Sequence, residues 1–173
     1  MFKIFTPTYF ENNIYDMDFK KYYEKGYRHL IFDIDNTLVE DEERENKKTI
    51  DKINEIKNMG FVCSILSNNY ELRVKKFAEN VGIKNWVCLA KKPKIDGYIE
   101  LINRFNIDKE KTLYIGDQLF TDILGANRAK IDVILVSPLG IDKHFYIRVK
   151  RFFENIIKFI YLNRIKNAAN KFK

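Results

Sequence analysis

The sequence predicts an α/β domain with a mostly parallel five-stranded sheet, covered by helices on both faces. Short apolar segments alternate along the chain with amphipathic segments of helical periodicity, which is the pattern of βαβ units. A chain of 173 residues with 46% hydrophobic residues can bury one ordinary core. Only three prolines and seven glycines are present, so we expect one compact unit without flexible linkers.

The first expected strand, 30–32, ends in a polar loop, and the first long helix follows at 46–59. Gly60, directly after this helix, is suited to close it as a left-handed cap. The strand 61–66 then begins at once. The apolar residues of the helix recur at the spacing of one helical face: Ile50, Ile53, Ile56 and Met59.

The same alternation continues through the rest of the core. Gly82 ends the next amphipathic segment, and each later apolar run is again short. Because ligands of open parallel sheets bind beyond the carboxyl ends of the strands, the polar segments that follow these strands should converge at one edge. We expect helices at 70–81, 95–105 and 119–129, and strands at 86–89, 113–115 and 133–136.

Positive charge is concentrated at the carboxyl-terminal end of the chain. Residues 143–173 hold nine Lys or Arg and one acid, Glu154, whereas the whole chain has a net charge of +7. We therefore expect a near-neutral catalytic core at 1–142, with an amino-terminal extension at 1–27, and a basic helix at 143–173 packed on or appended to the core. A local cationic segment favours an anionic membrane surface as the partner over nucleic acid.

Residues 145–161 are the most strongly amphipathic part of this basic segment. At about 100° per residue, aromatic and aliphatic side chains fall on one face and basic side chains on the other. The apolar face could pack on the protein's own sheet, which needs helices on both sides. An aromatic-rich face with a basic rim also fits interfacial binding to anionic lipid, and both interpretations stay open.

Cysteine use and hydropathy predict a cytoplasmic protein, and the basic segment adds peripheral attachment at the inner face of the membrane as an open interpretation. Cys63 and Cys88 lie in apolar runs, where a free thiol behaves as a small core residue, and no disulfide framework is implied. The first residues lack the apolar core of a signal peptide, and no stretch reaches the ~18 uncharged apolar residues of a membrane span. We expect no obligate protein partner.

Two carboxylates, Asp33 and Asp35, follow the first strand, and Thr37 lies in the same loop. This loop is too polar to be buried without a ligand, and two acids so placed need a cation. An Asp-x-Asp pair can equally be a polar turn whose carboxylates cap backbone amides. The remaining motifs decide between these two interpretations.

Three further polar segments each follow an expected strand. Ser67 and Asn68 offer donors suited to phosphoryl oxygens, and Lys92 precedes a proline at the sheet edge. Asp117 ends another strand, with Asp122 one turn into the following helix. Singly these segments could be a helix cap, a solvated lysine and a turn. In this order, each after a strand, they favour one common site.

With these four motifs, the sequence resembles the haloacid dehalogenase superfamily of phosphohydrolases, whose fold is Rossmann-like. The resemblance implies that Asp33 is the nucleophile that takes the phosphoryl group as an aspartyl phosphate. Asp35 would protonate the leaving alkoxide and later activate water. Mg²⁺ would be held by the Asp33 carboxylate, the Asp35 backbone carbonyl and Asp117.

The same resemblance implies roles for the other motif residues. Lys92 would be a catalytic residue that adds a second positive charge beside the phosphate. Asp122 would support the site by orienting Lys92 or a metal-bound water. The substrate-binding residues that hold phosphoryl oxygens would be Thr37, Ser67, Asn68 and Lys92.

The spacing of the motifs leaves no room for a cap domain. The two intervals where related proteins insert one hold only a helix, or a helix and a short strand.

A closer resemblance, over nearly the whole chain, is to the subclass IIIA capless phosphatases of YqeG type, which include the phosphatidylglycerophosphate phosphatases. It is carried by residues 33–39, 67–69, 73–75, 92–93 and 116–125.

This resemblance implies a Mg²⁺-dependent phosphomonoesterase that converts phosphatidylglycerophosphate to phosphatidylglycerol, with a lipid headgroup as its phosphorylated substrate. One alternative keeps the chemistry but changes the substrate to a soluble sugar phosphate, a nucleotide or a nucleic-acid end. A second alternative is a non-catalytic domain that binds a membrane or a partner. Such a domain should have lost Asp33, Asp35 or Asp117, and all three are present.

Overall fold

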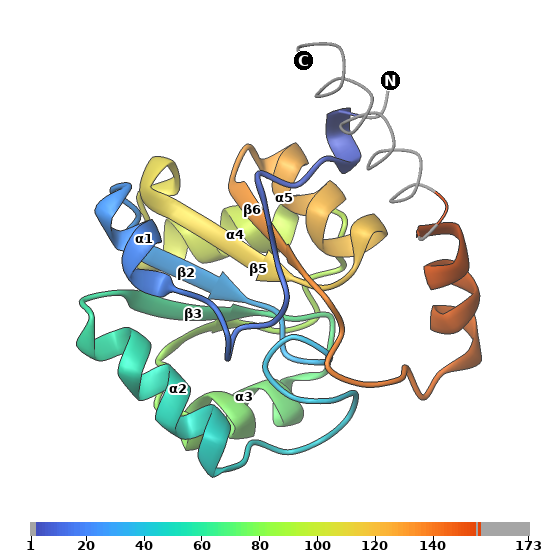
Figure 1. Cartoon of the computed structure of the whole chain (residues 1–173), viewed down its shortest axis with the longest axis horizontal. Coiled ribbons are helices and arrows are strands. Elements are labelled where there is room, and N and C mark those ends of the chain that lie inside the picture. Colours follow the sequence, from blue (N-terminus) through green and yellow to red (C-terminus); the bar gives the residue numbers. More distant parts are fainter. Residues whose placement is uncertain (1–2, 155, 157–173) are drawn as a thin grey trace, which may run out of the picture. The chain divides into compact units, whose positions relative to one another are not determined.

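The protein is described by a computed structural model that covers residues 3–154 and 156 (Figure 1). The chain divides into two compact units, one ending at Ile141 and the other beginning at Asp142. The first unit contains every strand of the described residues and all four sequence motifs. The fold is therefore described for this unit first, and the second unit by itself.

A six-stranded, entirely parallel sheet forms the centre of the first unit, in the order β1-β6-β5-β2-β3-β4. The predicted α/β class is confirmed. The central strands are buried along most of their length, as expected of a sheet covered on both faces. The strands are β1 (Tyr9–Glu11), β2 (His29–Phe32), β3 (Val62–Leu66), β4 (Asn85–Val87), β5 (Thr112–Gly116) and β6 (Asp132–Val136).

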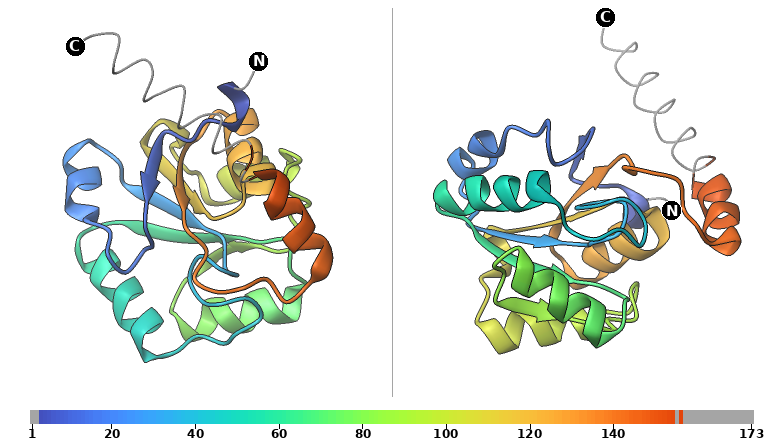
Figure 2. Two further views of the ribbon diagram at one scale, coloured as in Figure 1. Left: turned by 45° about the vertical axis from the view of Figure 1, so that its right-hand side comes forward. Right: turned by 90° about the horizontal axis from the view of Figure 1, so that it is seen from below.

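The prediction of five strands is wrong by one, because the expected amino-terminal extension contributes β1. This strand pairs in parallel with β6, with Tyr9 opposite Ile134, and Figure 2 shows the two side by side. A strand of only three residues is too short for an alternating pattern to be recognised in the sequence. Its pairing with β6 comes from contacts more than 100 residues apart along the chain.

Helices lie on both faces of the sheet, with α2 and α3 on one side and α4 and α5 on the other (Figure 1). Right-handed crossovers between parallel strands require this arrangement. From β2 the chain adds β3 and β4 on one side of β2, and then crosses back to add β5 and β6 on the other side. The helices are α1 (Phe19–Glu24), α2 (Lys47–Asn58), α3 (Glu71–Asn80), α4 (Asp96–Phe105) and α5 (Leu124–Ala129), with a π-helical turn at Leu119–Ile123.

Local chemistry explains the helix boundaries. Asn46 caps α2, and its side chain accepts a hydrogen bond from the Thr49 amide at 3.0 Å. Gly60 follows with φ of 99° and Gly82 follows α3 with φ of 68°, which are left-handed conformations that glycine adopts without strain. The predicted helix at 119–129 begins as the π-helical turn and becomes α-helical only at Leu124.

The second unit is described from Asp142 to residue 154, together with residue 156. Residues 145–154 are helical, and Arg151 forms an ion pair with Asp142, with Nη2 3.0 Å from Oδ1. Phe145 is 71% exposed, and four further large apolar residues of this helix are also exposed: Tyr146, Val149, Phe152 and Phe153. Residue 156 is helical as well, and the remaining residues of the predicted helix at 145–161 lie outside the described part of the chain. Among the described helices, none is long and apolar enough to cross a membrane.

A buried histidine in β2 should make the fold acid-sensitive. The His29 ring is 8% exposed and lies 2.7 Å from the Ser64 hydroxyl, and burial lowers the pKa of His29 from 6.5 to about 4. The folded state therefore disfavours the protonated ring, and this contribution to stability is complete above pH 6.5 and is lost as the pH falls toward 4. Between these limits the free energy of unfolding should fall by up to about 3 kcal/mol.

The measurement is urea denaturation at several pH values for wild type and His29→Gln. The variant should lose less stability than wild type between neutral pH and pH 4. His144→Gln, which changes an exposed histidine, is the matched control and should follow wild type. Parallel pH profiles for wild type and His29→Gln would contradict the assignment.

Candidate active site

The four sequence motifs meet at the carboxyl edge of the sheet. Asp33 follows β2 and donates its amide to the Ile115 carbonyl of β5 at 3.0 Å, so the ladder of the sheet holds it in place. Ser67 follows β3 and is fixed in the same way, with its amide 3.1 Å from the Val87 carbonyl. Asp117 directly follows β5. Strand pairing therefore fixes the backbone positions of the first residues of these motifs.

Lys92 is the centre of a buried ionic cluster. Its side chain is 2% exposed, and its Nζ lies 2.9 Å from Asp33 Oδ1 and 2.8 Å from Asp122 Oδ1. Lys92 Nζ also donates to the Tyr114 hydroxyl at 2.8 Å. An ammonium group so enclosed is stable only because carboxylates surround it, so the cluster forms as a unit.

Three carboxylates come together beside this lysine. Ligand oxygens of Asp33, Asp117 and Asp122 all lie within 4.8 Å of one another, and all three residues are buried. Thr37 joins them, with Oγ1 3.5 Å from Asp117 Oδ1. Lys92 supplies one positive charge against three negative ones, so a hard divalent cation with oxygen ligands fits the remaining charge.

The charge states within the cluster follow from burial and from the neighbouring charges. Burial raises the pKa of Asp33, and the net value is about 7 because Lys92 lowers it while Asp122 and Asp35 raise it. Burial alone would lower the pKa of Lys92, but Asp122 and Asp33 outweigh that effect and raise it. The lysine is therefore always charged at neutral pH. Asp33 needs a further positive charge to be fully ionised.

Asp35 points away from the three-carboxylate cluster. Its Oδ1 accepts the Glu42 amide at 2.9 Å and also contacts Arg73, and its Oδ2 accepts from Asn69. The Asp35 side chain is 19% exposed, so it borders solvent and an incoming substrate can reach it. The expected metal ligand from this residue is its backbone carbonyl, which the direction of the side chain does not affect. The carboxylate that joins Asp33 and Asp117 is Asp122 rather than Asp35.

Ser67 and Asn68 hold the neighbourhood of Lys92 in shape. The Asn68 amide side chain bonds both sides of the Lys92 backbone, accepting from its nitrogen at 2.7 Å and donating to its carbonyl at 3.3 Å. The Ser67 hydroxyl is buried and accepts the Asn69 amide at 3.2 Å. The contact of these two residues with phosphoryl oxygens stays a prediction.

Several residues to which the sequence analysis gave no role of their own complete the site. Gly116 must be glycine, because a Cβ there would lie 2.6 Å from the Asp122 carboxylate. Asn36, with φ of 57°, accepts the Gly140 amide at 2.9 Å and so anchors the loop that carries the aspartates. Tyr114 lies in the buried strand β5, where the sequence suggests only a core residue. The structure shows that its hydroxyl accepts a hydrogen bond from Lys92.

A parallel sheet that gathers carboxylates, a lysine and hydroxyls at the carboxyl ends of its strands is the arrangement of phosphohydrolases that use a carboxylate nucleophile and a divalent cation. The sequence profile of haloacid dehalogenase-like hydrolases matches residues 45–136. The probable phosphatase YqeG of Bacillus subtilis (strain 168) is 37% identical over 150 residues, which cover 86% of this chain and 87% of the relative. The chain belongs to the haloacid dehalogenase-like hydrolases and is a phosphatase of that family. Phosphatases of this family use Mg²⁺.

Solved structures agree with this fold. An uncharacterized protein from Listeria monocytogenes serotype 4b superposes with a TM-score of 0.54 and 23% identity, over 68% of this chain and 84% of that one. A Vibrio cholerae protein provisionally assigned as a 3-deoxy-D-manno-octulosonate 8-phosphate phosphatase gives a TM-score of 0.51 at 19% identity, over 73% of this chain and 72% of that one. At these identities the likeness concerns the fold alone.

The carboxylate cluster predicts stabilisation by Mg²⁺. An ion that binds the folded state alone raises the free energy of unfolding by about 2.7 kcal/mol at a hundred times its dissociation constant. Wild type should therefore show a higher melting temperature in Mg²⁺ than in chelator, and Asp117→Asn should lose most of that shift. Asp51→Asn, at an exposed position of α2, is the control and should keep it. An undiminished shift in Asp117→Asn would place the ion elsewhere.

Proposed function

We propose that this phosphatase is a Mg²⁺-dependent phosphomonoesterase that acts through an aspartyl phosphate on Asp33, with phosphatidylglycerophosphate as its substrate and phosphatidylglycerol as its product. The contact of Lys92 with both Asp33 and Asp122 is the observation that carries the chemistry. It supplies a fixed positive charge where an anionic nucleophile must meet an anionic phosphate. Mg²⁺ on the Asp33 and Asp117 carboxylates would add the second positive charge.

The reaction divides between the two aspartates of the first loop. The Asp33 carboxylate attacks phosphorus and the bond to the leaving oxygen breaks, while Asp35 gives that oxygen a proton. Asp35 then takes a proton from water, which attacks the aspartyl phosphate and restores Asp33. Lys92 holds the phosphoryl oxygens throughout, and Asp122 keeps the lysine in place.

Among residues 3–154, no cap domain is present that could enclose a small substrate. Within residues 3–154, the interval between Asp33 and Ser67 contains α2, and the interval between Ser67 and Lys92 contains only α3 and β4. Specificity must therefore come from the setting of the phosphate, which favours a phosphate on a large or surface-bound molecule.

Exposed apolar side chains border the site on the loops that carry the motifs. Tyr70 is 59% exposed just after the Ser67 motif, Leu72 is 72% exposed in the first turn of α3, and Leu89 is 57% exposed just before Lys92. The Leu89 amide bonds the Asn69 carbonyl at 2.9 Å, so the two loops are joined. Large apolar side chains held in solvent beside a polar site suit a substrate embedded in a lipid surface.

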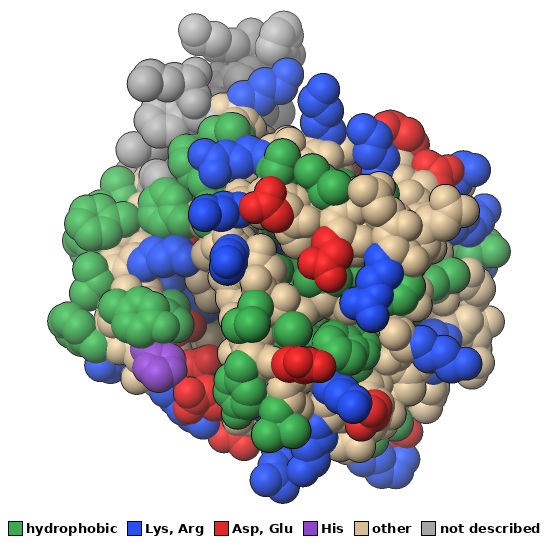
Figure 3. All heavy atoms as spheres, turned by 180° about the vertical axis from the view of Figure 1, so that it is seen from behind, with side chains coloured by type: hydrophobic (Ala, Val, Ile, Leu, Met, Phe, Trp, Pro, Cys, Tyr) green, Lys and Arg blue, Asp and Glu red, His purple; other side chains and the backbone are tan. Residues whose placement is uncertain are grey.

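The helix at 145–154 supports the same substrate setting by its own composition. Exposed aromatic residues share it with Arg148 and Lys150, a combination that favours binding to anionic lipid at about 1 kcal/mol per basic residue near the surface. On the face seen in Figure 3, basic side chains lie among acidic and hydrophobic ones. We infer a cytoplasmic enzyme that attaches peripherally to the membrane.

Asp33→Asn should abolish phosphate release from p-nitrophenyl phosphate, because an amide keeps the shape of the carboxylate but cannot attack phosphorus. A loss of at least about a thousandfold in kcat corresponds to about 4 kcal/mol of barrier. Asp35→Asn should be nearly as severe, and Asp51→Asn should match wild type. If Asp33→Asn kept activity within about tenfold of wild type, the covalent mechanism would be wrong.

Binding to lipid is measured by cosedimentation with vesicles. The protein should sediment with vesicles that contain phosphatidylglycerol at low salt and be released by about 0.5 M salt, because screening shortens the electrostatic range. Arg148→Glu with Lys150→Glu should weaken sedimentation and leave p-nitrophenyl phosphate hydrolysis intact. Arg151 is left unchanged because it pairs with Asp142.

The control for that pair is Lys109→Glu with Lys111→Glu, two exposed lysines at the amino end of β5, away from the carboxyl edge. These changes reverse the same number of charges and should leave sedimentation intact. Equal binding to neutral vesicles, or none to anionic ones, would contradict a role for the membrane. Phosphate release from soluble sugar phosphates alone would instead favour a metabolite as the substrate.

A further inference from the structure

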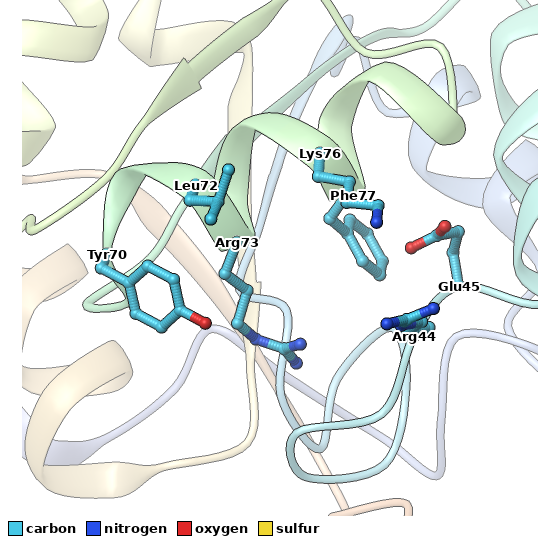
Figure 4. Close-up of a pocket in the computed structure, with 7 residues that line it drawn as sticks. All are labelled: Arg44, Glu45, Tyr70, Leu72, Arg73, Lys76 and Phe77. Atoms are coloured by element: carbon cyan, nitrogen blue, oxygen red, sulfur yellow. The ribbon is translucent and has the colours of Figure 1, made fainter.

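A cavity of about 210 Å³ lies beside the active-site loop, between α3 and residues 44–45 of the loop that follows the first motif. Figure 4 shows the side chains that line it, with Arg73 and Lys76 descending from α3 and Arg44 facing them from the loop. Tyr70 and Leu72 form its apolar border at the start of the helix. The proposed chemistry assigns no role to this cavity.

The cavity is positively charged, with three cations and one acid in its lining. The acid, Glu45, is engaged by the side chain of Asn80. Among the described residues, the side chains of Arg44 and Lys76 form no hydrogen bond or ion pair with protein groups. Two cations held around one cavity repel each other, so an anion bound between them would be stabilised.

Arg73 connects this cavity to the catalytic loop. Its Nη2 contacts Asp35 Oδ1 and donates to the Glu43 carbonyl at 3.2 Å. The Arg73 Nε is buried and has no hydrogen-bond partner within the described residues. The guanidinium group thus lies between the acid that protonates the leaving group and the cavity.

We infer that this cavity binds a second anionic group of the substrate, a phosphodiester that lies on the leaving-group side of the scissile phosphate. The inference rests on the proposed function, because it takes Asp35 as the group that meets the leaving oxygen. Whatever is attached to that oxygen passes Asp35 and then reaches Arg73, Arg44 and Lys76. A glycerol linker ending in a phosphodiester presents its negative charge on that side, a few bonds from the leaving oxygen.

The apolar border agrees with a phosphodiester rather than a free anion. Beyond the phosphodiester of a phospholipid come a second glycerol and the acyl chains, and the exposed Tyr70 and Leu72 stand beside the cations. Guanidinium and ammonium groups both bind phosphate oxygens. The cavity therefore selects for charge and for the position of that charge.

The test compares two soluble substrates that differ by the second anionic group: glycerol 3-phosphate and glycerophosphoglycerophosphate, the deacylated form of the proposed lipid. Wild type should have the lower KM for the second substrate. Arg44→Gln with Lys76→Gln should raise that KM by about tenfold with little change in kcat, and should leave glycerol 3-phosphate kinetics within twofold of wild type. Lys75→Gln is the matched control, since it removes an exposed lysine next to Lys76 that does not line the cavity.

A second measurement does not depend on hydrolysis of the lipid headgroup. Glycerophosphoglycerol has the phosphodiester but no phosphomonoester, and it should inhibit glycerol 3-phosphate hydrolysis competitively in wild type. The inhibition constant should rise by about tenfold in Arg44→Gln with Lys76→Gln. Equal inhibition constants, or no inhibition of wild type, would overturn the second anion site.

The two proposals can fail separately. Phosphate release from phosphatidylglycerophosphate vesicles that is the same in wild type and in Arg44→Gln with Lys76→Gln would overturn the second anion site and leave the proposed function standing. Inhibition by glycerophosphoglycerol that depends on Arg44 and Lys76, without release from those vesicles, would overturn the lipid substrate and keep the site. A melting temperature equal to that of wild type would show that the variant is folded.

Discussion

The buried contact of Lys92 with Asp33 and Asp122 is the constraint on which the rest of the site depends. Removing an ammonium group and carboxylates from water is costly, and only close pairing with further hydrogen bonds offsets the cost. Tyr114 and the Gln118 amide supply such bonds around Asp122. The remaining negative charge makes the cluster suitable for a divalent cation. Charge balance therefore ties the nucleophile, the lysine and the metal site to one another.

The parallel sheet makes this cluster possible, because the neighbouring strands β5, β2, β3 and β4 all end at one edge. Each strand is followed by a different motif of the site. The register of strand pairing fixes the position along the sheet at which each motif starts. Asn68 then holds the Lys92 backbone across two strand ends, and Asn36 anchors the aspartate loop to the segment after β6. The same edge is open to solvent beyond Asp35, where Arg73 and the cationic cavity begin. Catalysis and substrate selection thus occupy neighbouring parts of one surface.

The sequence predicts well those elements that are long enough to show a repeating apolar pattern, or that have clear capping residues at their ends. The helix expected at 46–59 is α2 at Lys47–Asn58, because Asn46 and Gly60 mark its ends. β1 could not be recognised because its three residues carry no pattern, and its place depends on β6. The Arg73–Asp35 contact could not be predicted either, since it joins a helix to a loop 38 residues away. The formation of short elements and the pairing of side chains depend on tertiary contacts, which the local sequence does not show.

The pairing of β1 with β6 also affects the order in which the chain can fold. Among the described strands, β1 is the first in the chain, yet its partner β6 is the last of them to leave the ribosome. Strands β2, β3 and β5, which carry catalytic motifs, can pair before that point. Pairing of β1 with β6 joins residues more than 100 positions apart and has to come later. Contacts of such long range slow folding. During synthesis, β1 must therefore remain unpaired until almost the whole core has been made.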